Sequence, residues 1–385
     1  MGNICRIVRP SVLRAISTKK FMPSARRTLA IFLATLLLSF STQLSAASLD
    51  ETKAQTRQLI QKVMTERRIP GLQIAVVKDG RLLLSESYGL ANVENKVPAT
   101  NSTLFPLNSG TKPLTGVAMA QLAEAGLVDL EAPISRYLDD LPLAWRSIRV
   151  RQLLAHTSGL PDIVDGPGLM AGATEADMWK AVKARPLEAQ PGERFAYNQT
   201  NYGLLAQIIV KQSGMPFEKY IAARQFAIAE MQLSTFGDSY DAVPNAATIY
   251  SYFPRRTLAP NDANRLSRWL YEMPYSLNAG GGLLTTADEM ARWIMALMKG
   301  RLMPVNRLDA MWLPEKLNSG ASGDWSAGWP VLAAAPHRQL AGIGGNRSAF
   351  VVYPDDGLAI VVLTNLVGGN PERFIPQIAE LYLRR

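Results

Sequence analysis

The chain has 385 residues, of which 48% are hydrophobic and 19% are charged, so its composition is that of a folded protein and excludes general disorder. The formal net charge is +9, but seven of the 41 Lys and Arg residues and none of the 32 acidic residues lie in residues 1–47. The remaining chain has 34 basic and 32 acidic side chains, and this balance gives no support to nucleic-acid binding.

Residues 1–47 have the pattern of a secretory signal peptide. A basic segment is followed by the apolar run Leu29–Phe40 and then by the small residues Ser45-Ala46-Ala47. The apolar run is shorter than the ~20 residues that a transmembrane helix needs. We therefore predict cleavage after residue 47, export to the periplasm or outside the cell, and no stable membrane anchor afterwards. The alternative is that this segment stays uncleaved as a membrane anchor. Translation starts at either Met1 or Met22.

The rest of the chain offers no metal or cofactor motif. Cys5 is the only cysteine and lies inside the predicted signal, so the exported chain would have neither disulfides nor a thiol nucleophile. The two histidines, His156 and His337, form no H-E-x-x-H motif, and no P-loop occurs. We therefore expect no cofactor and no metal.

The predicted elements differ between the ends and the middle of the chain. An amphipathic helix is predicted over residues 50–66, followed by strands over 71–78 and 81–89 that flank an Asp79-Gly80 turn. Strands are predicted again over 348–353 and 358–364, before a final helix over 371–383. Helical periodicity dominates between these ends, over residues 111–127, 148–156, 175–182, 202–213, 216–229 and 286–298.

This order predicts an α/β (α+β) protein with two lobes, which together occupy residues 48–385. An antiparallel β-sheet, flanked by the N- and C-terminal helices, would form one lobe from about residues 48–108 and 280–385. A mostly helical lobe would be inserted between its halves, over about residues 109–279.

The segment Leu104–Leu127 carries the most specific chemical pattern. Ser109 and Lys112 stand at the start of a predicted helix, and a spacing of three places both side chains on one helix face. The helix start also supplies N–H groups and partial positive charge that favour an oxyanion. Taken alone, this spacing is weak, because it recurs at Ser17–Lys20 inside the signal. The alternatives are a helix N-cap for Ser109 and a solvated lysine for Lys112.

Several longer segments, in order along the chain, make the pattern more specific. They are FPLNSGTKPLTGVAMAQL with AGLVDLEAPISRYL, RQLLAHTSGLPD, PGERFAYNQTNYGLLAQII, NAGGGLLTTADEMARW and GIGGNRSAFVVYPDDGLAIVVLTN. In these segments the chain resembles the family of class C β-lactamases, penicillin-binding DD-peptidases and β-lactamase-like esterases. The resemblance extends over most of the chain after residue 47.

The resemblance implies a serine hydrolase in which Ser109 forms an acyl-enzyme and Lys112 helps to deprotonate it. It implies that Tyr197 accepts the serine proton and later protonates the leaving group, because a phenol near cations can ionise. The alternative for Tyr197 is a half-buried loop aromatic. The N–H groups of Ser109 and Asn346 would form the oxyanion hole.

Two departures from the family pattern affect the expected substrate. Gln199 stands where the second box usually has Asn, so contacts with substrate should shift. The third box, usually Lys-Thr-Gly or His-x-Gly, aligns here with Ile343-Gly344-Gly345. Ile343 cannot pair with a substrate carboxylate, whereas Gly345 still allows close approach of the substrate. Arg347 could replace the missing charge, but strand alternation leaves its direction open.

Other conspicuous residues receive structural interpretations. His156 is expected at a helix end and turn, and His337 at the surface. Gly280-Gly281-Gly282 is expected as a tight turn beside the site and not as a phosphate loop, since the required Lys-Ser/Thr is missing.

The leading functional hypothesis is therefore acyl transfer to water from small or uncharged esters and amides, with weak activity on β-lactams. The partners expected are a small acyl substrate or a cell-wall peptide, with a monomeric protein. The alternative is a catalytically weak protein that binds penicillin or cell-wall peptides.

Overall fold

Strands from the two ends of the chain pair with each other in the computed structural model, which describes residues 48–164, 174–253 and 264–383. The predicted signal peptide, residues 1–47, lies outside the described residues. Contacts divide the chain into Met1–Ala54, of which residues 48–54 are described and helical, and Gln55–Arg385. All that follows concerns the second unit.

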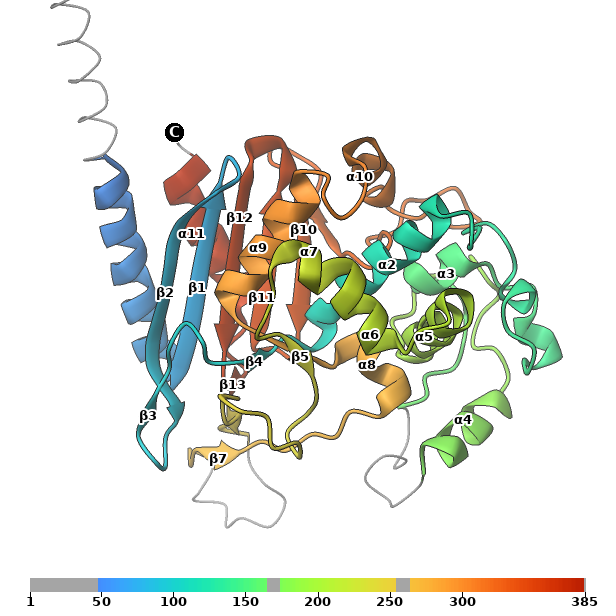
Figure 1. The fold of residues 1–385 in the computed structure, drawn as a ribbon, viewed down its shortest axis with the longest axis horizontal. Coiled ribbons are helices and arrows are strands. Elements are labelled where there is room, and N and C mark those ends of the chain that lie inside the picture. Colours follow the sequence, from blue (N-terminus) through green and yellow to red (C-terminus); the bar gives the residue numbers. More distant parts are fainter. Residues whose placement is uncertain (1–47, 165–173, 254–263, 384–385) are drawn as a thin grey trace, which may run out of the picture. The chain divides into compact units, whose positions relative to one another are not determined.

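The main sheet has seven strands in the order β3-β2-β1-β12-β11-β10-β9, and every neighbouring pair is antiparallel. The central contact joins β1 to β12, with Leu72 opposite Thr364 and Lys78 opposite Leu358. Figure 1 shows the blue and red strands side by side. The strands are β1 Gly71–Lys78, β2 Arg81–Asn92, β3 Val97–Pro98, β9 Val331–Ala333, β10 Gln339–Gly344, β11 Ser348–Tyr353 and β12 Leu358–Thr364.

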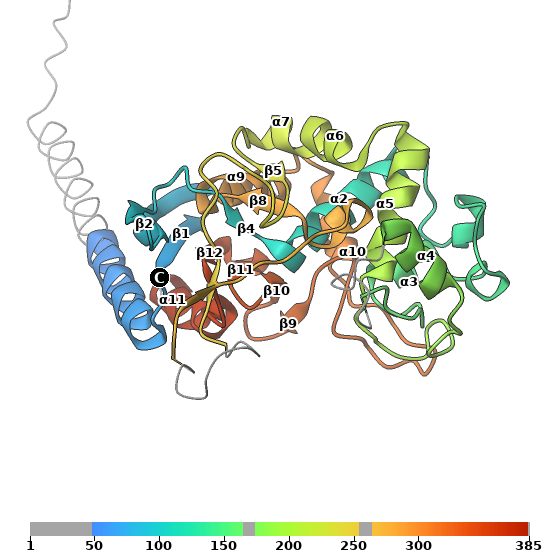
Figure 2. The same cartoon turned by 90° about the horizontal axis from the view of Figure 1, so that it is seen from below.

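Local sequence accounts for the first hairpin. Asp79 and Gly80 both have positive φ, +50° and +68°, as the turn between two strands of right-handed twist requires. Residues of β1 are buried on both faces because helices cover both sides of the sheet. Helix α9 (Ala287–Met298) covers one side, and α11 (Ile375–Leu383) covers the other (Figure 2). Residues 55–67 form a helix that contacts α11 through a Thr56–Tyr382 hydrogen bond.

Helices and short strands fill the middle of the chain (Figure 1). The remaining helices are α2 Lys112–Glu124, α3 Val150–Leu154, α4 Glu175–Lys183, α5 Thr200–Ser213, α6 Phe217–Ile221, α7 Ala227–Ala229, α8 Asn278–Gly281 and α10 Val305–Met311. A π-helical turn, Ala222–Phe226, joins α6 to α7, so the helix predicted over 216–229 is irregular. Two small sheets, β4-β8-β5 and β13-β6-β7, use the strands β4 Phe105–Pro106, β5 Thr235–Phe236, β6 Tyr250–Ser251, β7 Ser267–Arg268, β8 Leu283–Thr285 and β13 Leu366–Val367.

The sheet and the helices share one apolar core. Its buried members include Leu114 and Leu205 from the helices and Trp293, Trp329 and Phe350 from the sheet side. Because this core is continuous, the helical lobe packs on the sheet and is not a separate folding unit. The predicted fold class is confirmed, and the lobe boundaries remain a prediction. Within the described ranges, no helix is both long and apolar enough for a transmembrane span.

Candidate active site

Ser109 lies where the chain leaves a strand and enters a helix. Strand β4 pairs with β8, and the Leu107 N–H donates to Leu283 O over 2.8 Å. The backbone then bends at Asn108, whose φ is +48°, and continues through the 3₁₀ turn Asn108–Thr111 into α2. No described residue accepts a hydrogen bond from the Ser109 N–H, so this donor can face an oxyanion at the helix start.

Lys112 lies one turn after Ser109 and is fully buried. Its Nζ is 3.3 Å from Ser109 Oγ, 3.0 Å from Gln199 Oε1 and 2.8 Å from Gly280 O. Burial lowers the pKa of Lys112, because the charged ammonium loses its hydration. The structure thus places an amine with an increased tendency to be neutral beside the serine hydroxyl, on the helix face that the spacing predicts.

Tyr197 reaches the same hydroxyl from a segment 88 positions away, and its Oη donates to Ser109 Oγ over 2.7 Å. Burial alone would raise the pKa of Tyr197, but the nearby Lys112 charge and hydrogen bonds outweigh it and lower that pKa. The side chain remains 39% exposed, so the phenol lies at an open surface that a substrate can reach. The structure brings Ser109, Lys112 and Tyr197 together, whereas their catalytic roles remain a prediction.

Gln199 bridges the two ionisable groups and is more than the substrate contact expected from the sequence. Its Oε1 accepts from Lys112 Nζ at 3.0 Å, and its Nε2 lies 3.4 Å from Tyr197 Oη. The backbone N–H of Gln199 donates to Asp162 Oδ1 over 3.0 Å, which holds the start of α5 in place. The amide is therefore aimed at the lysine and the tyrosine.

His156 supports the segment that carries Tyr197. The two rings have their centroids 4.4 Å apart, and His156 Nδ1 accepts the Asn198 N–H over 3.3 Å and lies 3.1 Å from Asn201 Nδ2. Burial and the Lys112 charge keep the pKa of His156 well below its usual value, so the imidazole is neutral. His156 accordingly has the structural placement expected for it. His337 lies at the surface beside Asp356, as predicted.

The end of β10 lies directly against the nucleophile. A Cβ atom at Gly344 would be 1.9 Å from Leu107 O and 2.8 Å from Ser109 N, so only glycine fits there. Gly345 and Asn346 follow in a turn with φ of +57° and +55°. The carbonyl of Asn346 accepts the N–H groups of Gly368 and Asn370, and its own N–H as an oxyanion donor remains a prediction.

The side chain of Ile343 does not face Ser109. A Cβ at Gly342 would meet the Phe350 ring at 2.3 Å, and one at Gly344 would meet the Ser109 segment, so both glycines face the helical side. Because side chains alternate along β10, Ile343 projects from the opposite face. The strand therefore presents backbone and no side chain to the nucleophile, which is a stronger departure from the family pattern than the alignment indicates.

Arg347 points toward the residue before the nucleophile. It is 3% exposed, its Nε donates to Asn108 Oδ1 over 2.8 Å, and its Cζ lies 4.9 Å from the centre of the Tyr271 ring. Burial lowers the pKa of Arg347 to about 10. The sequence left the direction of the Arg347 side chain open, and in the structure this side chain points toward Asn108.

Two groups at the site were not predicted as participants. The carbonyl of Gly280 accepts from Lys112, and Asn108 holds Arg347. The glycine run 280–282 is a sequence signal for the Gly280 carbonyl, because a side chain at Gly280 would collide with its neighbours. A Cβ there would lie 2.8 Å from Gln199 Oε1 and 3.6 Å from Lys112 Nζ. No sequence signal separates Asn108 from an ordinary turn residue.

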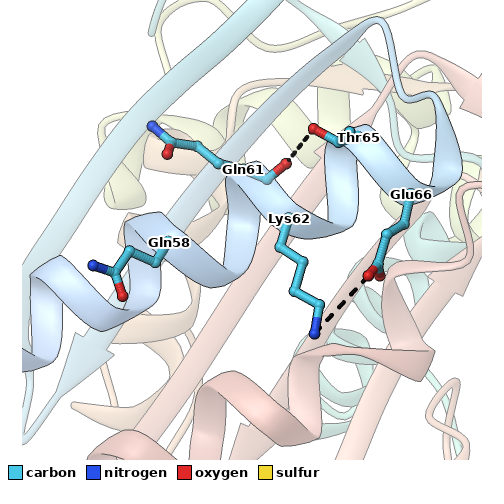
Figure 3. A pocket seen from close by; sticks show the side chains of 5 residues that line it. All are labelled: Gln58, Gln61, Lys62, Thr65 and Glu66. Carbon is cyan, nitrogen blue, oxygen red and sulfur yellow. Dashed lines mark hydrogen bonds and ion pairs between the residues drawn. The ribbon is translucent and has the colours of Figure 1, made fainter.

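We find neither a metal site nor a second catalytic cluster among the other polar side chains of the described residues. In the described part of the chain no three His, Cys, Asp or Glu side chains are placed to hold a metal ion. A shallow depression on the helix over residues 55–67 contains none of the residues around Ser109; it is lined by Gln58, Gln61, Lys62, Thr65 and Glu66 (Figure 3).

Comparisons with known proteins agree with this geometry. The sequence profile described as Beta-lactamase matches residues 56–382. Protein flp of Staphylococcus aureus (strain MW2) is 25% identical over 345 residues, which cover 86% of this chain and 66% of that protein. This chain thus spans just under two thirds of the length of that relative.

Putative penicillin-binding protein PbpX of Bacillus subtilis (strain 168) is 27% identical over 295 residues, which cover 77% of this chain and 70% of that protein. The solved structure of the octameric penicillin-binding protein homologue from Pyrococcus abyssi has a TM-score of 0.70 at 24% identity. That match covers 86% of this chain and 77% of the other. At such identity the likeness shows a shared fold.

Proposed function

The chain belongs to the Beta-lactamase family, and on that premise we propose that it is an exported serine hydrolase that forms an acyl-enzyme on Ser109, with esters or amides as substrates. The observation that carries the proposal is the convergence on Ser109 Oγ of Tyr197 Oη at 2.7 Å and Lys112 Nζ at 3.3 Å. Nucleophile and base within hydrogen-bond reach are the signature of covalent catalysis.

The proposed mechanism moves one proton in each half-reaction. Lys112 and Tyr197 share a proton, and the form with an ionised phenol accepts the Ser109 proton as Oγ attacks the acyl carbon. The Ser109 N–H stabilises the oxyanion that forms. Tyr197 then gives its proton to the leaving alcohol or amine, which breaks the ester or amide bond and leaves acyl-Ser109. A water molecule then gives a proton to the Tyr197 phenolate and attacks the acyl carbon. Tyr197 returns this proton to Ser109 Oγ as the bond between the acyl group and Oγ breaks, which releases the acid and restores the enzyme.

The substrate preference follows from β10. β-Lactams and D-alanyl peptides carry a carboxylate that a basic third-box residue would bind, and neither Gly342, Ile343 nor Gly344 supplies that charge. Loss of one charge-assisted hydrogen bond costs about 1.5–3 kcal/mol, or roughly ten- to a hundredfold in binding. We therefore propose esterase or amidase activity with weak β-lactamase activity.

The test compares 4-nitrophenyl butyrate with a chromogenic cephalosporin, using the chain without residues 1–47 and its Ser109→Ala variant. The proposal expects ester hydrolysis, little cephalosporin hydrolysis, and neither activity in the variant. Intact mass after exposure to a fluorophosphonate should increase by one adduct that Ser109→Ala abolishes. Efficient cephalosporin turnover would overturn the substrate preference, and an unlabelled Ser109 would overturn the mechanism.

A second candidate is a catalytically weak protein that binds penicillin or cell-wall peptides. The observation that favours it is the absence of any side chain from the face of β10 toward Ser109 among residues 342–344. A penicillin adduct on Ser109 that persists for hours, with no ester turnover, would favour this candidate. Export is tested separately, by following secretion of the chain with and without residues 1–47.

A further inference from the structure

In the part of the chain that the structure describes, a buried arginine beside the nucleophile has no acidic partner. Arg347 is 3% exposed, and among the described residues its guanidinium donates only from Nε, to the neutral amide of Asn108. Its other contact is with the face of the Tyr271 ring, at 4.9 Å. Neither terminal nitrogen of Arg347 has a protein acceptor within the described residues.

This arrangement is costly and differs from that of Arg151. Burying a cation without an anion is unfavourable, and a cation–π contact offsets only part of that cost. Arg151, by contrast, pairs with both Glu131 and Glu315. Fold stability does not explain a buried unpaired guanidinium, whereas recognition of an anion does, because its planar fork matches a carboxylate.

The turn that follows β10 lies directly against Asn108 and Arg347. Gly345 is exposed, and a Cβ at that position would lie 2.7 Å from Asn108 Oδ1 and 3.1 Å from Arg347 Cζ. Any other residue at Gly345 would therefore collide with Asn108 and the guanidinium. Only glycine lets these two groups lie directly beneath the exposed turn, and the terminal nitrogens of Arg347 are not among the fully buried polar atoms that lack a partner.

Arg347 and Asn108 lie on one particular side of the reacting atoms. Asn108 directly precedes Ser109, and Gly344 abuts the Ser109 N–H that would bind the oxyanion. Tyr197, which would protonate the leaving group, approaches the same serine from the segment that carries Gln199. The leaving group must lie near Tyr197, so the Asn108 side is left for the acyl half of the substrate.

We propose that Arg347, together with Asn108 and beneath the exposed Gly345, forms a subsite for a carboxylate on the acyl half of the substrate. The proposal rests on the proposed hydrolase function and narrows it to acidic acyl esters or amides. The terminal nitrogens of Arg347 would donate to both carboxylate oxygens. This carboxylate differs from the one that a basic third-box residue binds in β-lactams and D-alanyl peptides. The proposal replaces the expectation of uncharged substrates, as far as the acyl half is concerned.

The test uses two 4-nitrophenyl esters of equal chain length, the neutral hexanoate and the mono-ester of adipic acid. We expect the ratio of kcat/KM for adipate to that for hexanoate to fall at least about tenfold in Arg347→Met. Arg347→Lys should retain an intermediate ratio, because it keeps the charge without the fork. Arg301→Met, a change at an exposed arginine that contacts Ile228 O and Glu230, should leave the ratio unchanged.

A purely structural role would give a different result. If Arg347 only braces Asn108, Arg347→Met lowers both rates together and the ratio stays constant, which overturns the proposal. Thermal unfolding adds a second readout: replacing an unpaired buried cation by Met should leave Tm unchanged or raise it. A large fall in Tm would show instead that the fold depends on the guanidinium.

Binding without catalysis separates this proposal from the proposed function. Calorimetry on Ser109→Ala should detect adipate at concentrations where hexanoate does not bind, and the difference should disappear on adding Arg347→Met. Equal binding of both acids would overturn the subsite even if ester hydrolysis is efficient. Preferential adipate binding without any ester turnover by the unaltered protein would support the subsite and contradict the hydrolase.

Discussion

Tyr197 Oη lies 2.7 Å from Ser109 Oγ, although 88 positions separate the two residues in the chain. The contact depends on the placement of a loop, because Tyr197 precedes α5 and does not share an element with Ser109. Lys112 lies 4.8 Å from the centre of the Tyr197 ring, so charge on either group is felt by the other. The predictions below concern this contact and its supports.

Tyr197→Phe should slow acylation of Ser109 by about 10²–10⁴-fold, the usual contribution of a general base. Pre-steady-state release of 4-nitrophenol measures that step directly. Tyr202→Phe is the matched control, because the Tyr202 ring is also near Lys112, at 4.9 Å, but its hydroxyl donates to Leu154 O. An acylation rate for Tyr197→Phe within a few-fold of the unaltered protein would remove the phenol from the mechanism.

The acylation rate should rise with pH and reach half its maximum below pH 10.0, the ordinary pKa of a tyrosine, because the pKa of Tyr197 is lowered. The rate rises, and does not fall, with pH because Tyr197 can accept the serine proton only after it has lost its own. Lys112 and Tyr197 titrate as a pair, so the midpoint belongs to both.

Lys112→Met should move the midpoint of that pH profile to higher pH, because the cation that lowers the pKa of Tyr197 is removed while burial still raises it. The profile is measured with a neutral ester between pH 6 and the limit of protein stability. A midpoint that moves to lower pH, or does not move, would contradict the coupling of the two groups.

His156→Phe should lower kcat and stability while keeping an aromatic ring against Tyr197. The change removes the acceptor for the Asn198 N–H, and an unpaired buried donor costs about 1–3 kcal/mol. Thermal unfolding and kcat for the ester measure both effects. His337→Phe is the control at the surface, where neither quantity should change by more than experimental error. An unchanged kcat in His156→Phe would show that the imidazole does not position the tyrosine.

Ile343→Lys should not confer cephalosporin hydrolysis, because this side chain leaves β10 on the face away from Ser109. The alignment alone predicts the opposite, since it places Ile343 at the basic position of the family. Rates on a chromogenic cephalosporin decide between the two. A gain of tenfold or more would mean that the strand presents residue 343 to the site.

Much of the architecture was accessible from short-range patterns. Apolar runs, the Asp79-Gly80 turn and helical periodicity predict the strands β1, β2, β11 and β12 and the surrounding helices. Each of these signals depends on neighbours within one turn or one hairpin. The contact between Ser109 and Lys112 belongs to the same class, since a spacing of three on a helix places two side chains side by side.

The remainder of the site depends on packing between distant segments, and only the tertiary structure decided it. Gln199 and Gly280 meet Lys112 because α5 and α8 pack against α2, and spacing along the chain carries no information about such contacts. The direction in which a strand side chain points is even harder to predict from an alignment, because a shift of one residue moves the side chain to the other face of the sheet. For this reason an alignment places Ile343 at the nucleophile, whereas the fold turns it away and brings Arg347 to Asn108.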